Sequence, residues 1–282
     1  MTVGAVATAS ATPGPADDRV QQAAIGWEVQ NPIAPADLQA LVADGTRRIT
    51  DVHVNSVGPL MLSAVVIHNG GAYAVSGEHL FYGLTVDTAI ADFKSENRRP
   101  LVMEPYVNTD GTLLVAGIDV PDTGPDARGW QILRGSMSYV VANITAGNRP
   151  ITLRTYVDPS SGNREYLVTA VKNTENYGWY WYFNVTANQI SNGSLGPSDE
   201  SLIDASADNN TAMGINVVYY TGLPTPHGYY EGWPYFDTSL SNLVQDAKEL
   251  SYRVLCYTQY TLHGTGTANG ETEFLASEGD ND

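Results

Sequence analysis

Residues 149–183 read RPITLRTYVDPSSGNREYLVTAVKNTENYGWYWYF, and this stretch decides the fold. Residues 150–157 alternate between two faces, which is the period of a β-strand. The cluster 158–162 (DPSSG) has turn chemistry and ends that strand. Residues 165–172 form a second, apolar strand, and 178–183 form a third that is dense in aromatic side chains. The stretch therefore predicts three consecutive strands.

The landmarks of this stretch recur along the whole chain. A Gly-Trp pair, or Gly-Glu in one case, begins at residues 26, 77, 129, 178 and 232, at spacings of 51, 52, 49 and 54. A second landmark, Arg in four of five copies and Ser in the other, stands at 48, 99, 149, 201 and 253. A fixed period of this size is the signature of a repeat architecture.

A helical pattern follows each Gly-Trp position. Ser136 is placed to cap one helix and Thr85 another, and Pro35 stands near the start of a third, where its missing N–H does no harm. Apolar residues over 240–250 predict the strongest helix, whereas the helix near 186–192 is weak. Each repeat therefore reads as three strands and a helix.

The fold class that follows is mainly β with short helices, in five repeats of about 51 residues. The terminal pieces complement each other, so we expect a propeller-like ring whose fifth repeat is shared between the termini; Glu271–Ala276 would then pair near Gln22–Gln30. An open, curved array is the alternative. The predicted divisions are a disordered segment 1–21, one repeat domain 22–277, and an acidic tail 278–282. The repeats within the repeat domain are 48–98, 99–148, 149–200, 201–251, and 252–277 joined with 22–47.

Composition excludes several classes of partner. The net charge of −17 disfavours nucleic acid and anionic membrane surfaces, because both require a basic face. No apolar run approaches the roughly 18 residues that a membrane span needs. The single cysteine, Cys256, excludes an internal disulfide and a Cys-rich zinc site. The first 20 residues fit a signal peptide poorly, because no basic residue precedes their apolar stretch.

The unit spanning residues 149–183, followed by a short helix, resembles the bacterial tandem repeat domain found in the N-terminal region of polyglycine hydrolases. The likeness of pattern extends over about residues 22–277. In those hydrolases the chemistry belongs to a separate domain that uses Ser-x-x-Lys, and the residues three before the lysines here are Ala91, Thr169 and Gln245. The resemblance thus implies the repeat fold without the hydrolase activity, and it favours a secreted or cell-surface location over a cytoplasmic one.

Superposing the repeats points to one candidate site. Strand alternation places two mostly polar sets on one face of each first strand, and an apolar set that includes Leu153 on the other face, toward the helices. The polar faces should be exposed to solvent, and their side chains should converge on the axis of a ring. The candidate ligand-binding residues are Asp51, His53, Glu104, Arg154, Asp204, Ser206 and Thr258. An aromatic loop cluster offers possible partner contacts at His227, Tyr229, Tyr230 and Tyr235.

Two functions and one structural interpretation fit these residues. The polar set could be a plug whose members satisfy one another. It could be the axial site of a non-hydrolytic binding module for one polar or extended ligand, a saccharide, peptide or small molecule. Alternatively it could serve an enzyme that acts on a small molecule, with His53 and Glu104 in acid–base chemistry and Arg154 holding an anion. No cofactor is indicated, and a metal at Asp51, His53 and Asp204 is disfavoured because its ligands would come from different repeats.

The same pattern predicts how two neighbouring residues respond to mutation. If the polar face is exposed, Arg154→Ala should abolish binding of an anionic ligand at little cost in stability. Leu153→Ala, on the opposite face, should instead destabilise the fold and leave the site intact. Glu104 and Arg154 should lie close enough to pair without a ligand.

Overall fold

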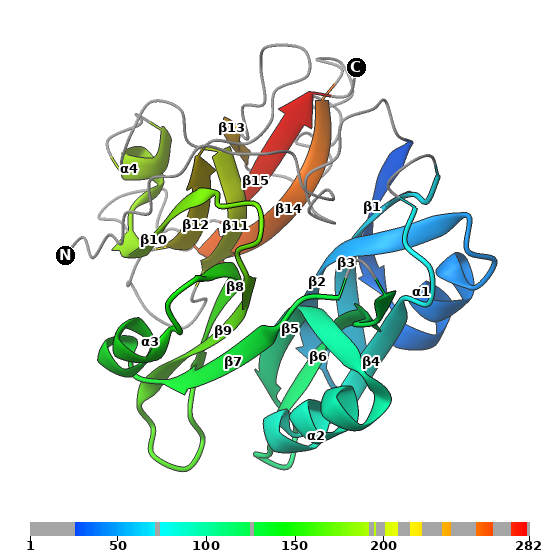
Figure 1. Cartoon of the computed structure of the whole chain (residues 1–282), viewed down its shortest axis with the longest axis horizontal. Coiled ribbons are helices and arrows are strands. Elements are labelled where there is room, and N and C mark those ends of the chain that lie inside the picture. Colours follow the sequence, from blue (N-terminus) through cyan, green and yellow to red (C-terminus); the bar gives the residue numbers. More distant parts are fainter. Residues whose placement is uncertain are drawn as a thin grey trace. The chain divides into compact units, whose positions relative to one another are not determined.

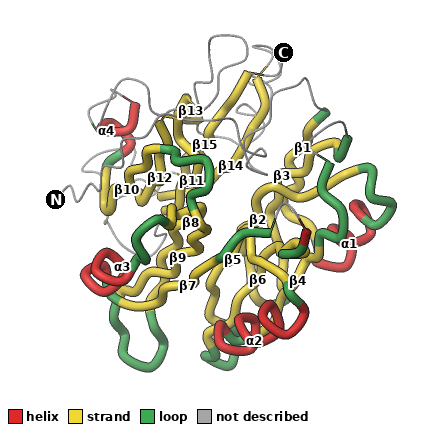
Figure 2. Tube along the Cα trace, in the orientation of Figure 1, coloured by secondary structure: helices red, strands yellow, loops and turns green. Residues whose placement is uncertain are grey.

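The computed structural model describes residues 26–70, 74–124, 127–191, 195, 201–207, 215–221, 233–237, 252–261 and 272–280. The described chain is mainly β, with a few short helices (Figures 1 and 2). Its residues fall into two compact units, one ending at Thr174 and the other beginning at Glu175.

The first unit contains nine strands and three helices in the order strand, helix, strand, strand, three times over. Their bounds are β1 (Trp27–Ile33), α1 (Pro35–Val42), β2 (Arg47–Val57), β3 (Leu60–His68), β4 (His79–Leu84), α2 (Val86–Glu96), β5 (Arg98–Val107), β6 (Leu113–Pro121), β7 (Trp130–Gly135), α3 (Met137–Asn143), β8 (Asn148–Val157) and β9 (Arg164–Lys172). The second unit contains β10 (Gly178–Val185), α4 (Ala187–Ser191), β11 (Ser201–Ala207), β12 (Ile215–Thr221), β13 (Trp233–Asp237), β14 (Tyr252–Thr261) and β15 (Thr272–Asp280).

The strands form three-stranded antiparallel sheets of one topology. In the first unit the orders are β1-β3-β2, β4-β6-β5 and β7-β9-β8, and in the second they are β10-β12-β11 and β13-β15-β14. Each sheet takes its strands from one contiguous stretch, and the last strand in sequence is always the central one. In Figure 1 each sheet accordingly keeps to a narrow band of the sequence colours.

The predicted pairing between Glu271–Ala276 and Gln22–Gln30 is wrong. Strand β1 pairs with β3, and β15 already has β13 on one edge and β14 on the other. A central strand has no free backbone edge for a third partner. Among the described strands, no sheet therefore combines the two ends of the chain. A sequence period fixes the length of a repeating unit but not where the unit begins.

Local chemistry explains the helix boundaries. Pro35 opens α1, and the hydroxyls of Thr85 and Ser136 accept hydrogen bonds from Thr88 N and Tyr139 N, each at 3.2 Å. These contacts satisfy amide groups that the first turn leaves unpaired. The three predicted starts are therefore confirmed, α4 is short as expected, and the helix predicted over 240–250 lies outside the described residues.

A β-bulge recurs at one place in every sheet. In β2 the register shifts between Ile49 and Asp51, and β5, β8, β11 and β14 shift at the equivalent step. Ile49 pairs with Val66 and Asp51 with Val65, so these residues face opposite sides although they are two apart. The bulge thereby places Asp51 and His53 on the same face as Arg48 and leaves Ile49 on the core face.

Neighbouring sheets of the first unit pack face to face. One apolar cluster joins Val52 of β2 and Leu38 of α1 to residues of β5 and β6, and another joins Met103 of β5 and Phe93 of α2 to Leu167 of β9. The apolar residues Val52, Met103 and Leu153, on β2, β5 and β8, are buried, as predicted. The helices expected to cover these apolar residues provide only part of their packing. The neighbouring sheet supplies most of the contact.

Candidate functional site

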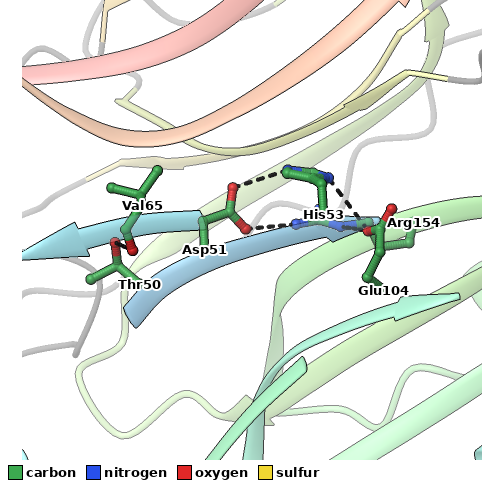
Figure 3. Close-up of polar contacts among 6 residues, drawn as sticks. All are labelled: Thr50, Asp51, His53, Val65, Glu104 and Arg154. Carbon is green, nitrogen blue, oxygen red and sulfur yellow. Dashed lines mark hydrogen bonds and ion pairs between the residues drawn. The ribbon is translucent and has the colours of Figure 1, made fainter. Parts of the chain in front are cut away.

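Four charged side chains from three sheets meet in the first unit. Asp51 and His53 come from β2, Glu104 from β5 and Arg154 from β8 (Figure 3). These strands, called here the site strands, contact one another in succession, β2 with β5 and β5 with β8. The structure thus brings together four of the predicted site residues, which are 103 positions apart at the extremes.

The four side chains form a closed quartet in which opposite charges alternate. Arg154 Nη2 donates to Asp51 Oδ1 at 3.0 Å, and Arg154 Nε lies 2.7 Å from Glu104 Oε2. His53 Nε2 lies 3.1 Å from Asp51 Oδ2, and its Nδ1 lies 3.5 Å from Glu104 Oε2. Each carboxylate therefore touches two cationic groups, and the predicted contact between Glu104 and Arg154 is confirmed.

The quartet holds His53 in its charged form. Burial by itself lowers the pKa of an imidazole, but the adjacent Asp51 and Glu104 carboxylates outweigh burial and raise the pKa of His53 from 6.5 to about 9. His53 is then an imidazolium at neutral pH, with an N–H on each ring nitrogen facing a carboxylate. Two positive and two negative charges leave the quartet neutral.

The expectation of a wet polar face is wrong for the deepest members of the quartet. The exposed fraction of the side chain is 0% for Asp51 and 1% for Arg154, against 12% for His53 and 17% for Glu104. Charges can be buried this deeply only when they are paired, because an isolated ion loses several kcal/mol of hydration. Mutual pairing within the quartet provides that compensation.

The open side of the quartet presents a hydrogen-bond acceptor. Glu104 Oε2 faces His53 and Arg154, whereas Glu104 Oε1 makes no hydrogen bond or ion pair with any described residue. Glu104 is also the most exposed member of the quartet. Whatever reaches the quartet from solvent therefore meets a carboxylate oxygen and the edge of the His53 ring.

The other predicted site residues lie in the second unit or outside the described chain. Asp204 and Ser206 are buried on β11, and Thr258 lies on β14 opposite Leu275. Tyr235 lies on β13 opposite Ala276. The remaining members of the aromatic loop cluster, His227, Tyr229 and Tyr230, lie outside the described residues. The structure therefore joins Asp51, His53, Glu104 and Arg154 within the first unit.

Sequence reasoning used the landmark arginines only for alignment, and the structure gives them a role. Arg48, Arg99 and Arg149 are 1%, 6% and 0% exposed, at the starts of the three site strands. Arg99 Nε lies 3.7 Å from Asp122 Oδ1. The signal was their recurrence: a long cation repeated at one strand position points to a buried structural role in each repeat.

A second charged cluster was also missed. The buried Asp119 of β6 pairs with Arg98 of β5 and lies 3.2 Å from Nδ1 of His79, whose side chain is half exposed. Arg98 additionally donates to the carbonyl of Gly77 at 2.6 Å. These contacts tie β5 and β6 to the turn that precedes β4, which is a structural role.

Neither a metal centre nor a membrane helix is found in the described residues. No group of three or more His, Cys, Asp or Glu side chains among them is arranged to hold a metal ion. None of the described helices is long and apolar enough to cross a membrane.

Comparison with known proteins assigns no relatives. No family model matches the sequence, and no curated protein matches it.

Proposed function

We propose that this protein is a non-hydrolytic binding module, whose polar ligand contacts the open side of the quartet. The observation that carries the proposal is that Asp51, His53, Glu104 and Arg154 already neutralise one another. A group locked in this way is a rigid, pre-organised surface, which favours binding because little entropy is lost when a ligand arrives. Saccharides, peptides and small polar molecules are the ligand classes considered.

The alternative, an enzyme acting on a small molecule, is less well supported by the same geometry. A general base must be unprotonated at working pH, and a group with a pKa of about 9 is unprotonated in only about 1% of molecules at pH 7. Arg154 is equally unsuited to hold an anionic substrate, because its side chain is buried and faces Asp51 and Glu104. The quartet lacks a free base and a free cation.

We also propose that the chain is built from five repeats closed into a propeller-like ring, with the site strands near its axis. Packed sheets lie about 10 Å apart, so the first and third sheets of a straight stack would be about 20 Å apart. Arg154 of the third sheet nevertheless reaches Asp51 of the first at 3.0 Å. That contact supports sheets that converge on one point, as blades do. The resemblance to the bacterial tandem repeat domain supports the same proposal.

Binding and turnover can be separated in one experiment. Saturation-transfer NMR would test maltohexaose, spermidine and citrate as neutral, cationic and anionic probes, and mass spectrometry would examine each compound after incubation. We expect at least one probe to bind and to be recovered unchanged. Failure of all three to bind, or chemical conversion of a bound probe, would refute the proposal.

The protonation state of His53 supplies a second test. In protein labelled with ¹⁵N-histidine, both ring nitrogens of His53 should remain protonated up to a pH of about 9. A midpoint near 6.5 would instead favour the enzyme.

A further inference from the structure

The ligand that suits this site can be deduced from which atoms of the quartet remain available. Each cation of the quartet is committed: Arg154 faces Asp51 and Glu104, and both ring nitrogens of His53 face carboxylates. Glu104 Oε1 is the atom without a partner among the described residues, and it belongs to the most exposed member. A ligand at this site must therefore bring hydrogen-bond donors.

From these contacts we infer that the site takes a cationic amine, with a ligand ammonium donating to Glu104 Oε1. This inference rests on the proposed binding function and gives that function a ligand class. An ammonium group has three N–H donors and no acceptor, so it complements a carboxylate oxygen and cannot compete for the buried N–H groups of Arg154.

The charge of the whole protein points the same way. The chain carries 31 acidic and 14 basic side chains. A field of this sign raises the local concentration of cations and repels anions before any contact is made. The earlier expectation that Arg154 would hold an anionic ligand is therefore replaced by a cationic ligand held by Glu104.

A general attraction between spermidine and an acidic protein must be distinguished from binding at this site. Glu104→Gln and Glu96→Gln each remove one negative charge, but Glu96 lies at the exposed end of α2, outside the quartet. Long-range attraction is reduced equally in the two variants, whereas a direct hydrogen bond is lost only in the first.

The test is calorimetric titration of the full chain with spermidine at pH 7, after circular dichroism has shown that each variant is folded. We expect Glu104→Gln to weaken binding at least about tenfold, the loss of a charged hydrogen bond, and Glu96→Gln to leave it unchanged. His53→Gln removes the competing positive charge beside Glu104 and should tighten binding several-fold.

The outcomes are distinct. Equal weakening in Glu104→Gln and Glu96→Gln, weakening in His53→Gln, or no binding of spermidine would overturn the inference. Binding of maltohexaose or citrate in place of spermidine would overturn it too, while leaving the proposed binding function intact. Should Glu104→Gln fail to fold, the response of His53→Gln decides alone.

Discussion

Removing Arg154 should destabilise this protein about as strongly as opening a cavity in its core. Arg154 is 1% exposed and contacts two carboxylates, one of them on the fully buried Asp51. Removing one partner of a buried ion pair typically costs about 3–5 kcal/mol, because the other charge is left without compensation. This magnitude replaces the small cost expected for an exposed pair.

The adjacent Leu153 supplies the matched comparison. It is fully buried on the opposite face of β8, and its truncation to alanine should cost about 2–5 kcal/mol. Arg154→Met keeps most of the aliphatic volume and removes the charge, so it separates electrostatics from packing. We expect Arg154→Met to cost at least about 2 kcal/mol of unfolding free energy.

Urea unfolding followed by circular dichroism would measure these free energies at pH 7. The double variant Asp51→Asn/Arg154→Met should cost less than the sum of its single variants, because the two charges interact directly. A cost below about 1 kcal/mol for Arg154→Met would show that the pair contributes as little as an exposed one. The argument for a buried, mutually compensated quartet would then fail.

Three further predictions follow from single contacts. His53 binds its proton more tightly in the folded protein than in the unfolded chain, so its protonation contributes about 3 kcal/mol to the free energy of unfolding. This contribution is fully present below pH 6.5 and is lost as the pH rises to about 9. Urea unfolding between pH 6 and 10 should show the decline, and His53→Gln should lack it. Thr85→Ala removes the cap of α2 and should cost about 1 kcal/mol, measured in the same way, whereas Thr109→Ala in an exposed loop should not. Gly117→Ala would drive a Cβ into the carbonyl oxygen of Val102, so thermal denaturation should show a marked loss of stability, and an unchanged melting temperature would contradict the close packing of β5 and β6.

Much of the local structure could be predicted from the sequence, because short-range rules determine it. Alternation over 150–157 gave the strand, and the caps of α2 and α3 followed from Thr85 and Ser136. The contact between Glu104 and Arg154 was also predictable, since both stand five residues after a landmark arginine.

The burial of the site could not be predicted in this way. Alternation shows that Asp51 and Leu153 lie on opposite faces of their strands, but not whether a further layer covers the polar face. The bulge could not be predicted from the sequence either, because it depends on backbone pairing with β3 and not on the side chains of β2. The same lack of long-range information left the starting point of the repeating unit open.

The bulge has a consequence for how these strands tolerate the loss of a residue. Thr50, like Asn55 further along β2, has no counterpart in the register with β3, because Ile49 pairs with Val66 and Asp51 with the next residue, Val65. A chain lacking Thr50 could keep every other pair of that register, and each side chain would stay on its present face. Loss of Val52 instead would shift one flank by a residue and turn its side chains to the opposite face. A deletion scan along β2 should therefore find Thr50 tolerated between two intolerant neighbours, and the equivalent position should be tolerated in β5 and β8.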